Sequence, residues 1–255
     1  MNETQILATA NATNVVAAWD DAHRYTPAPR HRRRLTLRML RGLDFADCLD
    51  AGCAQPFLLR AIVERFGADG FGCDISDAVI AANRAALPGC QFRVLDLTAE
   101  AWPGDRQFDL VVCSEVLEHL ADWRAAVANL VRMSRKHLLI TVPSGPRRKM
   151  DRMVGHLQHF AGPELRAALE EEGCTIRQVR YWGFPFHSLY KNLISAMSPA
   201  RLYTAFSGGE GYGMGKRLFS WLLSALFYAN DLGGSGYQLF VYAQPPAAPE
   251  GQHHG

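Results

Sequence analysis

Cys48-Leu49-Asp50-Ala51-Gly52-Cys53 is an apolar run that ends in an acid and a glycine turn. A second short apolar run, Phe71-Gly72-Cys73-Asp74-Ile75, also ends in an acid, and the residues between the two runs have a helical pattern. This layout is typical of a nucleotide-type site at the carboxyl edge of a parallel sheet, where the second acid accepts hydrogen bonds from ribose hydroxyls. The turn departs from the usual pattern, because Ala54-Gln55-Pro56 stands where a glycine-rich loop would continue.

The bulk composition is that of an ordinary globular protein. The chain has 255 residues, of which 48% are hydrophobic and 20% charged, and this favours one large domain or a domain with an embellishment. The net charge of +2 gives no case for a nucleic-acid partner. The six cysteines form no CxxC pair, which favours buried thiols in a reducing compartment. No secretory leader is apparent, and the expected location is the cytoplasm.

Predicted strands and helices alternate regularly from residue 45 onward. Strands are expected at 45–50, 70–74, 91–95, 108–113, 137–142, 175–181 and 236–243, and helices at 30–43, 56–66, 77–87, 123–133 and 163–172. Pro56 suits a first helical turn, and Ser76 suits an N-cap. This alternation indicates βαβ units and a parallel sheet.

Four motifs, in order and at ordinary spacing, resemble those of class I S-adenosylmethionine-dependent methyltransferases over about residues 44–182. The motifs are residues 49–53, Asp74, residues 95–97 and residues 108–120. The resemblance implies an α/β, Rossmann-like fold with a seven-stranded, mostly parallel sheet in the order 3-2-1-4-5-7-6. Helices would cover both faces, and a helical insertion would precede the antiparallel last strand.

The expected division of the chain follows from that fold. The expected parts of the chain are an N-terminal arm and cap helix (1–43), a cofactor-binding core (44–182), a substrate-covering insertion (183–235), the last strand (236–244) and a disordered tail (245–255).

The resemblance also implies where S-adenosylmethionine binds. The Gly52 turn would pass close to the methionine portion, Asp74 would bind the ribose hydroxyls, and Asp96 would accept from the adenine amine. The full expected set is Asp50, Ala51, Gly52, Cys53, Gln55, Asp74, Ile75, Asp96, Leu97, Ser114 and Glu115. Two interpretations of residues 54–56 stay open: Gln55 and Pro56 cap the following helix, or the cofactor pocket is altered. The first is favoured, because Asp50, Gly52 and Asp74 are present.

An acid-acid-histidine cluster follows the strand at 108–113. If a helical turn begins at Glu115, then Glu115, Glu118 and His119 lie on one face and could hold a divalent ion, Mg²⁺ or Zn²⁺, that activates a substrate hydroxyl. The spacing resembles the metal site of ubiquinone-biosynthesis O-methyltransferases and of small-RNA 2′-O-methyltransferases, with His156 or His159 as the further ligand. The expected catalytic set is His119, Glu115, His156 and His159, and the expected metal ligands are Glu115, Glu118, His119 and His159. The alternatives are a metal-free His119 base and a structural role.

The predicted function is methyl transfer to a small-molecule acceptor, most simply at a hydroxyl oxygen. One alternative is a repurposed, non-catalytic S-adenosylmethionine-binding protein, suggested by residues 54–56. A second is RNA 2′-O-methylation, suggested by the arginines in 30–41, although a solvated helix face explains these arginines better. The apolar run 218–229 is shorter than the ~20 residues that span a bilayer. A homodimer contact or a buried lid helix is favoured there over an interfacial helix.

Overall fold

The computed structural model describes residues 26–196, 214–232 and 234–247. The chain divides into two compact units, one formed by residues 1–38 with 183–233 and the other by residues 39–182 with 234–255. The smaller unit therefore combines most of the expected N-terminal segment with the expected insertion. The predicted arm at 1–22, and the predicted tail from residue 248 onward, lie outside the described residues.

The larger unit contains a seven-stranded sheet in the order β3-β2-β1-β4-β5-β7-β6, which confirms the predicted topology. The strands are β1 (Asp47–Ala51), β2 (Asp69–Asp74), β3 (Gln91–Val94), β4 (Phe108–Ser114), β5 (Ser134–Pro143), β6 (Thr175–Trp182) and β7 (Gln238–Gln244). Neighbouring strands from β3 to β5 pair in parallel. Strand β7 is antiparallel to both of its neighbours, β5 and β6.

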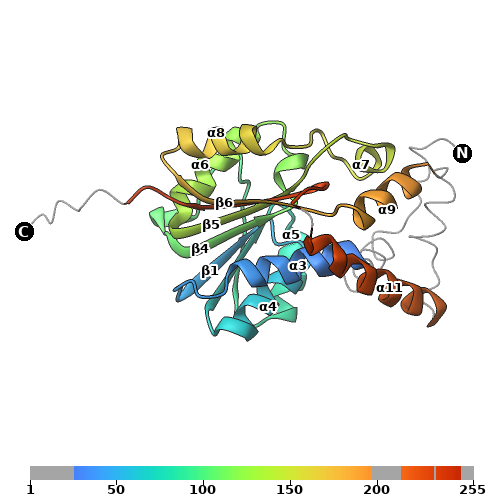
Figure 1. Cartoon of the computed structure of the whole chain (residues 1–255). Coiled ribbons are helices and arrows are strands. Elements are labelled where there is room, and N and C mark those ends of the chain that lie inside the picture. Colours follow the sequence, from blue (N-terminus) through green and yellow to red (C-terminus); the bar gives the residue numbers. More distant parts are fainter. Residues whose placement is uncertain (1–25, 197–213, 233, 248–255) are drawn as a thin grey trace, which may run out of the picture. The chain divides into compact units, whose positions relative to one another are not determined.

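Helices cover both faces of this sheet, so inner strands such as β1 and β4 are buried on both sides, whereas the edge strands β3 and β6 are largely exposed. The helices of the larger unit are α4 (Phe57–Phe66), α5 (Asp77–Ala86), α6 (Trp123–Met133), α7 (Lys149–Met153) and α8 (Gly162–Glu171). Figure 1 shows α6 and α8 on one face and α4 on the other. Ser76 is the N-cap of α5, as predicted, because its hydroxyl accepts from the Val79 amide at 3.3 Å.

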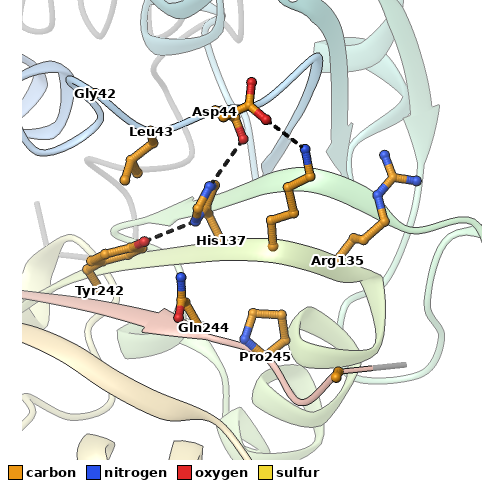
Figure 2. A pocket seen from close by; sticks show the side chains of 10 residues that line it. Gly42, Leu43, Asp44, Arg135, His137, Tyr242, Gln244 and Pro245 are labelled. Atoms are coloured by element: carbon orange, nitrogen blue, oxygen red, sulfur yellow. Dashed lines mark hydrogen bonds and ion pairs between the residues drawn. The ribbon is translucent and has the colours of Figure 1, made fainter. Parts of the chain in front are cut away.

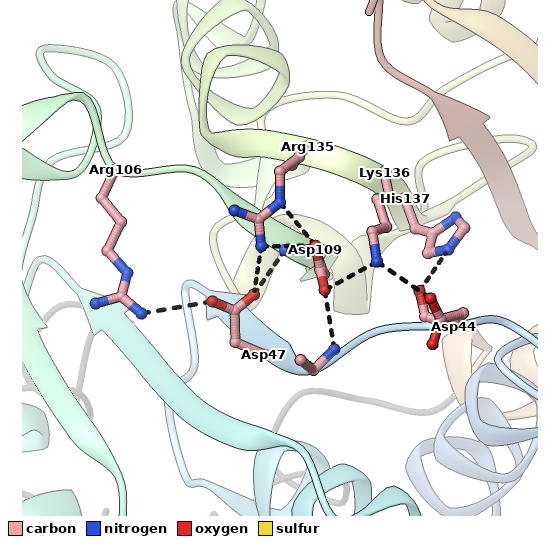
Figure 3. Close-up of polar contacts among 8 residues, drawn as sticks. Asp44, Asp47, Arg106, Asp109, Arg135, Lys136 and His137 are labelled. Atoms are coloured by element: carbon pink, nitrogen blue, oxygen red, sulfur yellow. Dashed lines mark hydrogen bonds and ion pairs between the residues drawn. The ribbon is translucent and has the colours of Figure 1, made fainter. Parts of the chain in front are cut away.

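The amino-terminal edge of the sheet is held by an ion-pair network (Figure 3). Buried Asp109 of β4 pairs with Arg135 at 2.7 Å and Lys136 at 3.2 Å, both from the start of β5, and Asp47 of β1 pairs with Arg106. Burial acts to raise the pKa of Asp109, but hydrogen bonds from the Ala46 amide and the two cations outweigh it and hold the pKa below its usual range.

Strand β5 consequently begins at Ser134 and not near residue 137 as expected. The two exposed cations are typical of a loop, but their partners come from β1, β4 and the segment before β1.

A cavity of about 480 Å³ lies at this same edge (Figure 2). Its lining includes His137, whose Nδ1 lies 2.9 Å from the Tyr242 hydroxyl and whose Nε2 lies 3.2 Å from the Asp44 carbonyl oxygen. Because β5 begins here, the cavity is at the opposite end of the parallel strands from Gly52 and Asp74. None of the predicted site residues lines it.

The smaller unit is helical in its described residues. It contains α3 (Pro27–Met39) up to residue 38, α9 (Phe186–Ser195), α11 (Met214–Phe227) and the 3₁₀ helix η3 (Tyr228–Leu232). The buried ring of His31 in α3 packs against Phe227 and Tyr228, and its Nε2 lies 2.8 Å from the Ser224 carbonyl oxygen. Arg34 donates two hydrogen bonds of 2.8 Å to Asp231. Among the described residues, no helix is long and apolar enough to cross a membrane.

His31 predicts an acid-sensitive stability. Burial lowers the pKa of His31 from 6.5 to about 4, although its hydrogen bond to Ser224 acts in the opposite direction. Between these two pH values the unfolded chain binds more protons than the folded one, so the free energy of unfolding should fall as the pH drops through this window. The full loss is about 3 kcal/mol, since one pKa unit corresponds to ~1.4 kcal/mol. Urea unfolding at a series of pH values should show a shallower dependence for His31→Gln, and an unchanged slope would contradict this assignment.

Candidate active site

The carboxyl ends of four neighbouring strands bring the predicted cofactor residues to one edge. Because the strand order is β3-β2-β1-β4, the residues that end or follow these strands lie in the order Asp96, Asp74, Gly52, Ser114. Adjacent strands are ~4.8 Å apart, so this row extends over roughly 14 Å. The edge therefore offers an elongated ligand two acids, a glycine turn and a hydroxyl, in that order.

Gly52 forms a turn that only glycine fits. Its φ is +76°, and an added Cβ would lie 2.3 Å from Val116 Cγ2. The amides of Gly52 and Cys53 both donate to the Cys73 carbonyl oxygen at 2.8 Å, which ties the turn to the end of β2. The backbone can therefore approach a ligand closely at this position.

Asp74 connects this turn to the start of α5. Its carboxylate accepts a hydrogen bond of 3.0 Å from the Ala54 amide on one oxygen and another of 3.0 Å from the Ser76 amide on the other. A carboxylate has about four acceptor positions, so two remain for a ligand with paired hydroxyls. The neighbouring Ile75 side chain is exposed at the same end of β2.

Asp50 lies beneath the turn and is nearly completely buried. Burial raises the pKa of Asp50 to about 7; the charge of Asp74 adds to the shift, and a hydrogen bond from the Leu59 amide opposes it. A cationic ligand at the Gly52 turn would relieve the repulsion between these two carboxylates.

The unusual residues 54–56 are accommodated by a side chain that the sequence did not single out. Asn83, on the buried face of α5, donates to the Ala54 carbonyl oxygen at 2.7 Å. Pro56 is the N-cap of α4, one position before the expected first helical turn, and Gln55 accepts from the Phe57 amide at 2.8 Å. The sequence feature that could have identified Asn83 is its position as a polar residue on an otherwise apolar helix face.

Asp96 lies just beyond β3, where the Thr98 hydroxyl donates to its Oδ1 at 2.7 Å and the Thr98 amide at 2.9 Å. Both hydrogen bonds lower the pKa of Asp96, and the bond from the Thr98 hydroxyl has the larger effect. An acceptor that is charged at neutral pH therefore stands at this end of the row. The buried residue Leu97 is fixed by Asn129, which donates to its carbonyl oxygen at 3.0 Å.

Glu115 is not part of a helical turn, so the expected common face of Glu115, Glu118 and His119 does not form. Its φ is +60°, and the short 3₁₀ helix η2 (Leu117–His119) begins two residues later. The Glu115 carboxylate accepts from Gln238 Nε2 at 2.7 Å, and Thr141 Oγ1 lies 3.4 Å away. Ser114, the expected neighbour of the sulfonium, shares a hydrogen bond of 2.9 Å with Thr141. Glu115 is thus turned toward the ends of β5 and β7.

Two groups of potential metal ligands are present among the described residues, and Glu115 belongs to neither. Glu118, His119 and His156 form the first group, in which the ligand atoms lie within 4.8 Å of one another. Asp151, His156 and His159 form the second. The downstream histidine that joins Glu118 and His119 is therefore His156, whereas His159 contacts His156 and Asp151.

Hydrogen bonds indicate the tautomers of these rings. A carbonyl oxygen only accepts, so His119 Nδ1, 3.2 Å from the Gly155 oxygen, carries the proton, as does His159 Nδ1, 3.1 Å from the Gly145 oxygen. His156 Nδ1 and His159 Nε2 share a hydrogen bond of 3.1 Å. With Nδ1 protonated, the neutral His119 ring presents Nε2 as an acceptor. Asp151 was not predicted; it lies in the short helix α7, and its Oδ2 is 3.6 Å from His159 Nε2.

Comparisons with known proteins agree with this arrangement. Residues 22–179 match the family model described as a methyltransferase domain. The ubiquinone biosynthesis O-methyltransferase of Stutzerimonas stutzeri is 30% identical over 114 residues, which cover 42% of this chain and 49% of the relative. The trans-aconitate 2-methyltransferase of Escherichia coli is 28% identical over 165 residues, 58% of this chain and 65% of the relative. The chain thus matches about half the length of the first of these relatives and under two thirds of the second.

A solved structure extends the likeness of fold to nearly the whole chain. Phosphoethanolamine N-methyltransferase 2 of Haemonchus contortus, in complex with S-adenosylmethionine, aligns with a TM-score of 0.63 at 15% identity, over 96% of this chain and 60% of that one. At this identity the likeness concerns the fold alone. The family model covers more than half of the sequence, and the sheet order is the one that the motifs predicted. The chain therefore belongs to the S-adenosylmethionine-dependent methyltransferase family.

Proposed function

We propose that this chain transfers a methyl group from S-adenosylmethionine to a hydroxyl oxygen of a small-molecule acceptor. The observation that carries the proposal is the row of Asp96, Asp74, Gly52 and Ser114 along one sheet edge, with His119 five residues after Ser114. The two curated relatives are named for methyl transfer, and one of them is named an O-methyltransferase.

The residues of the edge fit the cofactor. Asp74 retains acceptor positions for the two ribose hydroxyls, the charged Asp96 suits the adenine amine, and the Gly52 turn leaves room for the methionine portion. Asp50 and Asp74 suit a cation. The remaining contacts are assigned to Ala51, Cys53, Gln55, Ile75, Leu97, Ser114 and Glu115. When bound, S-adenosylmethionine supplies a methyl group already activated on a sulfonium, so the chain must position the acceptor and remove its proton.

His119 is assigned the proton transfer. Its ring is exposed, and its Nδ1–H is held by the Gly155 carbonyl oxygen, which leaves Nε2 as an acceptor for the proton of a hydroxyl. His156 and His159 are assigned a supporting role, because their hydrogen bond fixes the ring that lies against His119.

A divalent cation at Glu118, His119 and His156 is the metal-assisted form of this proposal. One carboxylate oxygen and two imidazole nitrogens suit Zn²⁺ better than Mg²⁺, which prefers oxygen ligands. Such an ion would supply Lewis acidity toward the acceptor hydroxyl. We assign acceptor selectivity to residues 183–235, since the family match ends at residue 179.

Replacing His119 by asparagine should lower the rate of methyl transfer by about a hundredfold or more, the usual contribution of a general base. The affinity for S-adenosylhomocysteine, measured by calorimetry, should not change, because His119 lies outside the row of cofactor residues. Glu118→Gln separates the two forms of the proposal. Loss of bound Zn²⁺ together with activity would indicate a metal site, whereas retained activity in the presence of a chelator would indicate a metal-free base.

The same measurements test the proposal as a whole. No binding of S-adenosylhomocysteine would overturn the cofactor assignment. Tight binding without methyl transfer to any of a panel of phenols, catechols and hydroxy acids would favour the repurposed, non-catalytic alternative. Activity on RNA that falls steeply with added salt would favour the nucleic-acid alternative.

A further inference from the structure

Helix α11 buries two serines and exposes several of its large apolar side chains. Ser220 and Ser224, one turn apart, are only 7% and 6% exposed, and the buried ring of Phe227 lies on the same face. Leu218, Trp221 and Leu222 face the other way and are 59%, 60% and 53% exposed. This is the reverse of the arrangement expected for a helix on the surface of a globular protein. The expectation of a buried lid helix therefore does not describe α11.

Neighbouring elements of the same unit extend this surface. In α9, the polar residues His187 and Ser188 are buried, while Leu189 and Leu193, one turn apart, are more than half exposed. Three further large side chains are more than half exposed, namely Phe184, Phe219 and Tyr228. We call the exposed set of Phe184, Leu189, Leu193, Leu218, Phe219, Trp221, Leu222 and Tyr228 the apolar face. Helices α9 and α11 contact each other, and large apolar side chains exposed on both of them mark an interaction surface.

The net positive charge of the chain comes from the same unit. Residues 1–38 and 183–233 contain ten basic and five acidic residues, a net charge of +5, whereas the rest of the chain carries −3. Among the described residues of the smaller unit, Asp231 is the only acid, and it pairs with Arg34 and Arg38. The apolar face itself carries no acidic residue. Burial, and after it the charges of Arg30 and Arg32, lower the pKa of Arg33.

These features fit an anionic lipid surface better than a second copy of the chain. Two copies joined through the apolar face would bring two units of charge +5 together, whereas an anionic bilayer attracts each cation by about 1 kcal/mol. Exposed tryptophan, tyrosine and phenylalanine are the residues that settle at the boundary between headgroups and acyl chains. A helix of 14 residues is roughly 21 Å long, too short to cross a hydrocarbon core of about 30 Å, but long enough to lie in its surface.

We propose that the apolar face of the smaller unit binds the surface of an anionic bilayer, with α11 lying in the plane of the interface and the basic residues of the unit at the headgroups. This proposal does not rest on the proposed methyl transfer. It differs from the order of preference drawn from the sequence alone, where a dimer contact or a buried lid was favoured over the membrane.

Flotation of the full chain with lipid vesicles tests the proposal. The protein should float with vesicles of phosphatidylcholine and phosphatidylglycerol, but not with phosphatidylcholine alone, and added salt should weaken binding. Leu222→Glu should reduce the bound fraction by about tenfold or more, because one exposed leucine contributes ~1.5 kcal/mol or more on burial. The matched control is Val179→Glu, which places the same charge at an exposed apolar residue of the larger unit and should leave binding unchanged.

A spectroscopic measurement locates the contact. Trp102, Trp123 and Trp182 are buried in the larger unit, and Trp19 is removed by the background substitution Trp19→Phe. In that background, a blue shift of tryptophan emission on adding anionic vesicles should disappear on Trp221→Phe. Unchanged calorimetric binding of S-adenosylhomocysteine would show that Leu222→Glu folds. Equal binding of Leu222→Glu and the parent chain to vesicles would overturn the proposal. A dimer would also overturn the proposal if the protein binds no vesicles. Light scattering would then show a mass that doubles with protein concentration in the parent chain and returns to the monomer mass in Leu222→Glu.

Discussion

Replacing Asp74 by alanine is expected to weaken the binding of S-adenosylhomocysteine by about a thousandfold. Two hydrogen bonds from ribose hydroxyls to a charged acceptor contribute about 1.5–3 kcal/mol each, and both are lost together. The variant also releases the Ala54 and Ser76 amides, which Asp74 holds on either side. The turn that shapes the site is thereby loosened as well. Calorimetry measures the change directly and needs no knowledge of the acceptor.

Asp77→Ala is the matched control for this prediction. Asp77 is an exposed acid in the first turn of α5, three residues further along the chain, so its loss removes the same charge without removing the proposed ribose contact. Asp74→Asn should lie between the two, because an amide oxygen still accepts while the amide nitrogen does not. Equal affinities for Asp74→Ala and Asp77→Ala would remove Asp74 from the cofactor site.

The second large effect is expected for Gly52→Ala. The new Cβ would meet Val116 Cγ2 at 2.3 Å, so either the turn or Val116 must move, in addition to the strain of an alanine at φ +76°. Overpacking of this kind costs about 1–3 kcal/mol, and the left-handed conformation about 1–2 kcal/mol more. Because the displaced atoms border the proposed methionine position, the affinity for S-adenosylhomocysteine should fall by about a hundredfold, the equivalent of ~2.7 kcal/mol.

Gly67→Ala separates the backbone strain of an alanine at positive φ from the steric overlap of its Cβ with a neighbouring side chain. Gly67 has a φ of +71°, but an added Cβ would meet no other atom within 4 Å. This variant should lose about 1–2 kcal/mol of stability and retain full cofactor binding. Adding Val116→Ala to Gly52→Ala should recover part of the lost stability, since all three nearest atoms belong to Val116. Thermal unfolding and calorimetry of the four proteins distinguish these contributions. Gly52→Ala behaving like Gly67→Ala would contradict the close approach at the turn.

The row of Asp96, Asp74, Gly52 and Ser114 could be predicted from the sequence because each of its parts is local. Each strand carries its own acid, glycine or hydroxyl at its end, and parallel strands place those ends on the same edge. Ser76 was predictable for the same reason, since an N-cap bonds an amide three residues away. The unusual residues 54–56 also followed local rules to within one position, because Pro56 is the N-cap of α4.

The parts that the sequence did not predict depend on distant partners. Glu115 follows a strand and precedes a helical pattern, but its orientation is fixed by Thr141 and Gln238, the second of them 123 residues away. Asp151 comes next to His159 only through the fold of the segment between β5 and α8, which contains α7. The sequence also did not indicate which face of α11 packs inward, because apolar residues surround most of the helix. Only the burial of Ser220 and Ser224 shows that the serines face inward.

The position of β7 has a consequence for how the molecule is assembled during synthesis. Strand β6 pairs only with β7 in the described sheet, and β7 in turn fills the place between β6 and β5. While the ribosome has produced only the residues up to 182, β5 is therefore an open edge and β6 has no place in the sheet. Gln238, which holds Glu115, arrives with the same strand. We infer that the end of the sheet that carries Glu115 is completed last, and that a nascent chain halted before residue 238 exposes an unpaired strand edge to chaperones.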